Sequence, residues 1–169
     1  MGSKHIRFRE IQGVMPKKML WLVVIFMILI MGLFGGIYIF QEFLGREVGE
    51  NSIPTGWALV IFIATALLIY YISRLKIVTR VDEKQLTMSL GVIGKRRFRL
   101  DSIEQINDYA GSPAAGFLGY GYRIGIKQTG YIGRAEQAIE LILKGEKRGL
   151  VITTNRPQEL KDALKLSDV

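Results

Sequence analysis

Two long uncharged apolar segments constrain this chain more than any other feature of its sequence. Residues 19–41 and residues 56–73 contain no Asp, Glu, Lys, Arg or His. A helix that crosses the hydrocarbon core of a bilayer needs about 20 apolar residues, and both segments suit that length. The second segment is apolar around its whole circumference, whereas a helix of a soluble protein normally carries a polar stripe. We therefore predict a hairpin of two transmembrane helices.

The first segment differs from a secretory signal peptide. The apolar core of a signal peptide has about 7–15 residues and precedes a cleavage site of small residues. Here the apolar run is longer, and the sequence FLGREVGE after it contains no Ala-x-Ala pattern. Trp57, Tyr70 and Tyr71 lie near the ends of the second segment, as expected for aromatic belts at the lipid–water boundary. These features favour a membrane anchor.

The charges that flank the two segments predict their orientation. Residues 1–18 contain five Lys and Arg against one Glu, whereas the connection 42–55 contains three Glu against one Arg. Lys and Arg are enriched on the cytoplasmic side of a membrane. We therefore expect a multi-pass protein of the cell membrane with both termini in the cytoplasm. Its parts are a basic N-terminal segment (1–18), a transmembrane hairpin with a short acidic external loop (19–73) and a cytoplasmic domain (74–169).

The cytoplasmic domain has the alternating pattern of half-buried strands. Strands are predicted at 74–81, 86–92, 95–100, 102–109, 122–127, 138–144 and 150–154. The chain then ends in an amphipathic helix, with Asn155 as its N-cap, Pro157 in its first turn and Gln158 at the capping-box position. We therefore predict an α+β, mainly β domain of about seven antiparallel strands, with a C-terminal helix that caps one open end.

This arrangement resembles the pleckstrin-homology (PH) superfold. Small prokaryotic membrane proteins with PH-like domains combine membrane segments, strands with a Val-Asp…Leu pattern, a Gly-aromatic-Gly-Ile/Tyr-Arg stretch and an Ile-x-Thr-x-x-Pro-x-x-Leu motif before the helix. The corresponding residues here are Val81 and Asp82, Leu86, and the ranges 119–123 and 152–160. The resemblance covers residues 75–166 and implies a PH-like fold without specifying a ligand.

Basic residues predict a positive surface near the membrane. Strand alternation places Lys95, Arg97 and Arg99 on one face of their strand. The surface would also include three residues that follow the second apolar segment, Arg74, Lys76 and Arg80. Each basic residue near an anionic leaflet contributes about 1 kcal/mol. Generic contact with anionic lipid, binding of a specific headgroup and a merely solvated face all remain open at this point.

Two further features suggest contacts. The Gly/Ala-rich stretch 107–121 contains Phe117 and Tyr120, which either reach a membrane or partner, or fold back over an open end of the domain; the second interpretation is slightly favoured. Gly32 and Gly36 have the Gly-x-x-x-Gly spacing that lets helices pack closely. Their partner would be the second helix or another copy of the chain, although glycine is also simply common in membrane helices.

The composition argues against catalysis. The chain has no Cys and a single His, His5, so disulfides, zinc–thiolate sites and His-based triads are not expected. Asp101 and Glu104 would lie on opposite faces of a strand. We expect no catalytic residue, cofactor or metal. The net charge of +8 would suit nucleic acid, but membrane tethering and the lack of a recognition helix disfavour that partner.

The sequence therefore predicts a non-enzymatic, membrane-anchored PH-like interaction module. Its cytoplasmic surface would bind a protein partner, another copy of itself or anionic membrane lipid. The alternative is an accessory or pore-forming subunit of a membrane complex, assembled through the transmembrane helices. The absence of intramembrane charges disfavours a transporter built from this chain alone.

Overall fold

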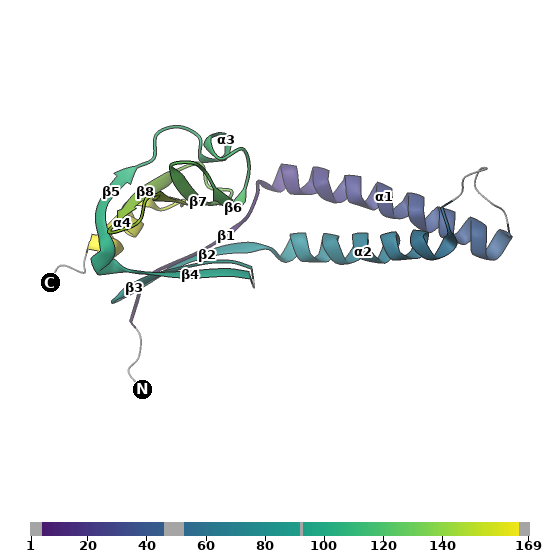
Figure 1. The fold of residues 1–169 in the computed structure, drawn as a ribbon, viewed down its shortest axis with the longest axis horizontal. Coiled ribbons are helices and arrows are strands. Elements are labelled where there is room, and N and C mark those ends of the chain that lie inside the picture. Colours follow the sequence, from purple (N-terminus) through teal and green to yellow (C-terminus); the bar gives the residue numbers. More distant parts are fainter. Residues whose placement is uncertain (1–4, 46–52, 92, 166–169) are drawn as a thin grey trace. The chain divides into compact units, whose positions relative to one another are not determined.

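A computed structural model describes residues 5–45, 53–91 and 93–165. The chain divides into two compact units (Figure 1). Lys17–Arg74 form the helical unit, and Met1–Pro16 together with Leu75–Val169 form the β unit. The helical unit is thus an insertion within the sequence of the β unit.

The helical unit consists of α1 (Lys17–Leu44) and α2 (Thr55–Arg74). At 1.5 Å per residue the two helices are about 42 Å and about 30 Å long. Many of their large apolar side chains point outward, and Trp21, Phe26 and Leu29 are 64–66% exposed. Soluble proteins rarely leave a continuous apolar surface of this extent in water. By length and composition, both helices could cross a membrane.

The two helices pack against each other through small and medium-sized side chains. Ala58 and Thr65 of α2 are buried, as is Met27 of α1. Gly35 faces the ring of Phe62, because a Cβ added at Gly35 would lie 3.2 Å from that ring. A glycine at this point therefore lets an aromatic ring approach the backbone of the neighbouring helix.

In the described residues the β unit contains nine strands in two sheets. The first sheet is antiparallel and has the order β1-β2-β3-β4. Its strands are β1 (Ile6–Gly13), β2 (Lys76–Asp82), β3 (Gln85–Leu90) and β4 (Ile93–Arg99). The short helix η1 (Leu100–Ser102) then connects β4 to β5 of the second sheet.

The second sheet has the order β5-β8-β9-β7-β6, and only its β7–β9 pair is parallel. Its strands are β5 (Ile103–Asp108), β6 (Gly121–Ile124), β7 (Gln128–Ile132), β8 (Ala138–Leu143) and β9 (Gly149–Thr153). The helix α3 (Pro113–Gly116) lies between β5 and β6, and α4 (Pro157–Lys165) follows β9.

One main core joins both sheets and α4. It contains the inward side chains of the first sheet, such as Ile77 and Met88, and those of the second sheet, such as Leu141 and Ile152. Leu160, Ala163 and Leu164 of α4 are buried in the same core. Their spacing is the apolar stripe of an amphipathic helix, so α4 covers the core with one face and leaves the other in solvent.

The N-terminal residues differ from the sequence prediction. Residues 1–18 were predicted as a separate basic segment, whereas Ile6–Gly13 forms the edge strand β1 and pairs with β2. Its inward positions are Phe8, Glu10 and Gln12, all of which are buried. Two of these three side chains are polar. Buried and exposed positions therefore alternate along β1, but apolar and polar residues do not.

The number of strands also differs from the predicted seven. Besides β1, the prediction lacked β7, because residues 122–127 were assigned to a single strand. In the structure β6 ends at Ile124, and a turn follows in which the N–H of Gly125 donates to the carbonyl of Gln128. Strand β7 then pairs with β9 in parallel. The predicted sheet of antiparallel strands is therefore correct only in part.

The C-terminal helix begins near the predicted residue but without the predicted capping box. Pro157 is its first residue. The side-chain amide of Asn155 donates to Glu10, and that of Gln158 donates to Asp162 in the next turn. The start of α4 is thus held by a strand from the other end of the chain.

Candidate functional site

The outer face of the first sheet gathers basic side chains from all four strands. The register places Arg9 opposite Arg80, Arg80 opposite Thr87, and Thr87 opposite Arg97. Residues that pair across neighbouring strands point to the same face of a sheet. One row across the sheet therefore carries three arginines.

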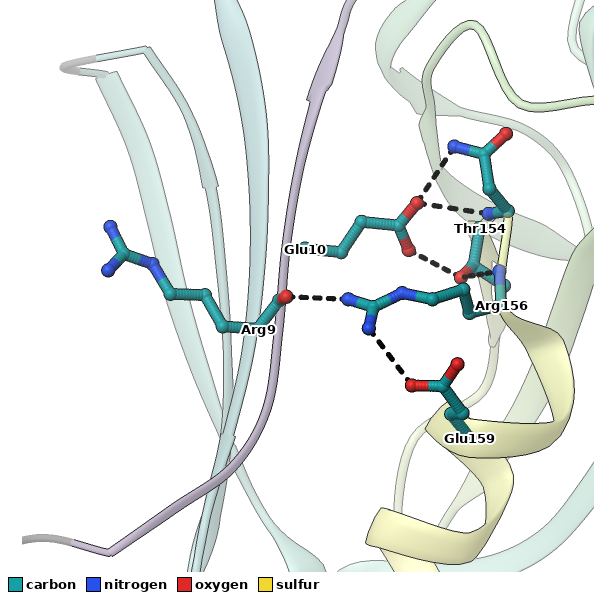
Figure 2. A network of polar contacts seen from close by, with 6 residues as sticks. Arg9, Glu10, Thr154, Arg156 and Glu159 are labelled. Carbon is teal, nitrogen blue, oxygen red and sulfur yellow. Dashed lines mark hydrogen bonds and ion pairs between the residues drawn. The ribbon is translucent and has the colours of Figure 1, made fainter.

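Further cations lie on the same face at even spacings along β2 and β4. We define the basic face as Arg9, Lys76, Arg80, Lys95, Arg97 and Arg99. Five of the six side chains are exposed and Arg80 is half-buried. Figure 2 shows the side chain of Arg9 on the opposite side of β1 from the inward-pointing Glu10. The face thus combines strands that precede and follow the helical unit in sequence.

Two acidic residues neutralise part of the basic face. The Nε atom of Arg80 lies 2.7 Å from Oδ1 of Asp82. The guanidinium of Arg99 donates two hydrogen bonds to Asp101, one of them at 3.0 Å. These bonds hold the pKa of the Asp101 carboxyl below its usual value and raise the pKa of Arg99. Within the described ranges no ion pair involves the other four cations.

The structure brings together five of the six basic residues predicted from the sequence. Arg74 lies instead at the end of α2, where its guanidinium is 5.4 Å from the centre of the Tyr70 ring. Arg9 was missed as a member of the surface. The signal for Arg9 is the alternation of residues 6–13. This alternation is recognised as a strand only if the polar residues Glu10 and Gln12 are accepted as buried.

The two aromatic residues predicted as contact residues fold inward. Phe117 is half-buried against a small cluster of Ile132, Ala138 and Val151. Tyr120 is also half-buried and packs on the same cluster. The loop that carries them therefore packs on apolar side chains of the second sheet.

The glycine pair of α1 does not pack against α2. A Cβ added at Gly32 or Gly36 would meet no other atom within 4 Å. The close contact with α2 is made instead by Gly35, the residue directly before Gly36. The predicted packing of Gly32 and Gly36 on the second helix is therefore absent from this structure.

A buried polar network connects β1 to the start of α4 (Figure 2). Glu10 is 7% exposed and accepts hydrogen bonds from Thr154 and Asn155. Arg156 donates to the backbone carbonyl of Arg9 and to the carboxylate of Glu159. Because its groups bond to one another, this network is structural in character. Among the described residues, no group of three or more His, Cys, Asp or Glu could hold a metal ion.

No protein-family model matches this chain, and no curated protein matches it. The basic face is a solvent-exposed array of fixed cations that is only partly neutralised within the chain. Such an array attracts anionic surfaces and suppresses contact with cationic ones.

Proposed function

We propose that this chain is a non-enzymatic, membrane-anchored interaction module that presents the basic face to an acidic surface of a partner protein. In this proposal α1 and α2 span the cell membrane, their connection is external, and the β unit lies in the cytoplasm. The observation that carries the proposal is the row of Arg9, Arg80 and Arg97 across four paired strands. A rigid sheet holds these cations at fixed spacings, which favours recognition of a matching set of acidic groups.

The pairing of β1 with β2 supports this topology. Gly13, the last residue of β1, is paired with Lys76, the first residue of β2. Both connections to the helical unit therefore leave the first sheet at the same end. A hairpin of two membrane helices returns the chain to the side from which it started, and the excess of Lys and Arg in both flanks favours the cytoplasm as that side.

The β unit is proposed to be PH-like. Two sheets share one core with a C-terminal helix, and that helix buries Leu160 and Leu164. The insertion of a membrane hairpin between β1 and β2 would be an elaboration of such a fold. In this proposal the basic face is formed by strands of the first sheet.

The distribution of the cations favours a protein partner over the bilayer. Lys76 lies at the end of the sheet where the connections leave, and Arg80 is about 13 Å further along β2, at 3.3 Å per residue. Charges in physiological salt are screened over about 8 Å. Because the basic face continues along the strands to Arg99, a bilayer at the connected end would engage only part of it. A second copy of a chain with net charge +8 is a poor source of the acidic surface.

A photo-cross-linking amino acid at Thr87 tests the proposal, because Thr87 lies between Arg80 and Arg97 in the row. We expect a protein adduct in native membranes, and we expect the double variant Arg9→Glu/Arg97→Glu to lose it. The same probe at Gln158, an exposed position of α4, is the matched control and should not give this adduct. An adduct with lipid alone, or a protein adduct that survives the charge reversal, would contradict the proposal.

A further inference from the structure

Three apolar side chains form an exposed tip on the β unit. Leu118 is 91% exposed, Ile124 is 62% exposed and Ile126 is 93% exposed. They are the most exposed large apolar side chains among the described residues of the β unit. Leu118 follows α3, and the two isoleucines belong to the β6–β7 hairpin. We call these three residues the apolar tip.

The segments that carry the apolar tip border a common groove. The groove has a volume of about 790 Å³ and is lined by the end of α3 and by the β6–β7 hairpin, from Tyr122 to Gln128. The backbone at Leu118 has φ of 52°, a left-handed conformation that leucine rarely adopts. Hydrogen bonds from the N–H groups of Leu118 and Gly119 to Ala115 and Ala114 hold this turn. The outward position of Leu118 is therefore fixed by the local fold.

One neighbour of the apolar tip, Gly121 at the start of β6, lies close to the end of the first sheet at which the connections to the helical unit leave. Strand β6 is an edge strand of the second sheet, and Figure 1 shows it at the opposite end of the β unit from β5. A Cβ added at Gly121 would lie 3.9 Å from Val14 and 3.8 Å from Leu90. Val14 follows β1, and Leu90 pairs with Ile77 at the start of β2. The first residue of β6 thus borders the end of the first sheet at which both connections leave, and Leu118 precedes it by three residues.

The stretch of sequence that carries the apolar tip is basic, and the acidic side chain that contacts it from β8, Glu140, is bonded to Gln128. Residues 109–135 contain no Asp or Glu but include Arg123, Lys127 and Arg134. Arg123 and Lys127 flank the two isoleucines and are exposed. Exposed apolar side chains between Lys and Arg are typical of surfaces that enter the boundary of an anionic bilayer, because the apolar groups leave water while the cations stay at the headgroups.

We propose that Leu118, Ile124 and Ile126 insert into the cytoplasmic leaflet of the membrane that holds α1 and α2, with Arg123 and Lys127 at anionic headgroups. This inference rests on the proposed membrane anchoring, but it does not depend on the partner of the basic face. The apolar tip lies on the segment after α3 and on the β6–β7 hairpin of the second sheet, whereas the basic face is the outer side of the first sheet. Insertion of the tip therefore leaves the basic face available to a protein.

The test uses the full chain reconstituted in vesicles of phosphatidylcholine and phosphatidylserine. Because the chain has no cysteine, the single variants Leu118→Cys and Ile126→Cys can each carry one environment-sensitive fluorophore. We expect quenching by doxyl-labelled lipid and protection from aqueous iodide at both positions. The matched control is Gln105→Cys, an exposed position of β5, the edge strand on the opposite side of the second sheet from β6, which should show the reverse pattern. Tip labels that iodide reaches and doxyl lipid does not quench would overturn the inference.

A label at Leu29→Cys in α1 separates this inference from the proposed function. If doxyl lipid fails to quench the Leu29 label, the membrane anchoring itself is wrong. If it quenches that label but not the tip labels, only the inference fails. Tip labels protected from both quenchers would indicate contact between copies and would also overturn it.

The charge contribution is tested with Arg123→Glu/Lys127→Glu. We expect this double variant to reduce quenching of the tip labels severalfold in vesicles that contain phosphatidylserine and to leave the Leu29 label unchanged. In vesicles of phosphatidylcholine alone the variant should behave like the parent chain. An equal effect in both vesicles would overturn the assignment of Arg123 and Lys127 to anionic headgroups.

Discussion

Glu10 in the first strand accepts a hydrogen bond from the backbone N–H of Asn155, at 3.0 Å and across 145 positions of sequence. The same carboxylate accepts a hydrogen bond from the hydroxyl of Thr154 and one from the side-chain amide of Asn155. Because Glu10 is 7% exposed, these donors replace the water that its charge would otherwise require. One carboxylate thereby fixes the N-terminal strand to the entry of the C-terminal helix.

Glu10→Ala should destabilise the β unit. The substitution leaves the donors of Thr154 and Asn155 without their acceptor in a buried place, which costs about 1–3 kcal/mol for each unsatisfied group. Hydrogen exchange of the full chain should show faster exchange in β1 and at the start of α4. Glu136→Ala removes an exposed carboxylate from the same unit and should leave those rates unchanged. Equal exchange in the two variants would contradict a structural role for Glu10.

Phe8→Ala should be more damaging than a matched substitution on the outer side of β1. Phe8 is 4% exposed in the main core, and the guanidinium of Arg156 lies 4.7 Å from the centre of its ring. Truncation of a buried Phe typically costs about 3–5 kcal/mol. Ile11→Ala, at a position 47% exposed, is the control with a far smaller expected loss. The free energy of unfolding in denaturant would measure both, and similar losses would show that β1 is not anchored through Phe8.

The helices and several strands could be predicted because their signal is local. An uninterrupted apolar run predicts α1 and α2, and apolar residues alternate in β2 and β3. Strand β1 lacks that signal because Glu10 and Gln12 occupy inward positions. Their burial is possible because residues 123 to 145 positions away form hydrogen bonds with them. The buried state of these polar groups is therefore a property of the tertiary structure.

The basic face could be predicted only strand by strand. Alternation places Arg97 and Arg99 on one face of β4, and it places Lys76 and Arg80 on one face of β2. The row from Arg9 to Arg97 additionally requires the order and register of four strands. A shift by one residue would turn every side chain of a strand to the other face. Local patterns predict which residues share a face but not which strands are neighbours.

Gly133→Ala should disturb a second buried link between β1 and the second sheet. A Cβ at this position would lie 2.5 Å from Oε1 of Gln12, which is 1% exposed. Gln12 donates to the carbonyl of Thr153 at 2.6 Å and accepts from the N–H of Ala135 at 3.3 Å. Displacement of its amide should cost about 1–3 kcal/mol, measured as a loss in the free energy of unfolding.

Two variants sharpen the Gly133 prediction. Gly13→Ala is the matched control, because its Cβ would meet the nearest atoms at 3.7 Å, an ordinary contact distance. In the background Gln12→Ala the clash disappears, so Gly133→Ala should then cost less than in the parent chain. Substitutions at residues in contact are expected to be non-additive in this way. Strictly additive losses would show that Gln12 does not mediate the effect of Gly133→Ala.

We expect the stability of the β unit to fall at alkaline pH because of the ionisation of Tyr131. Burial raises the pKa of Tyr131 from 10.0 to about 12, and its hydroxyl donates to the carbonyl of Gly94 at 3.0 Å. The folded chain therefore keeps this proton at pH values where the unfolded chain has lost it. Because the unfolded state then binds fewer protons, the free energy of unfolding decreases as pH rises from about 10 to about 12, and this decrease is absent at lower pH.

Tyr131→Phe isolates that contribution. The variant should lose about 1 kcal/mol at neutral pH, because the hydrogen bond to Gly94 is gone, but its stability should fall less steeply at alkaline pH. Spectrophotometric titration of tyrosinate in the folded chain should show a late component from Tyr131, and this component should be missing from the variant. Tyr109→Phe is the matched control and should retain both the late component and the steeper fall in stability. A late component that persists in Tyr131→Phe would assign it to another tyrosine.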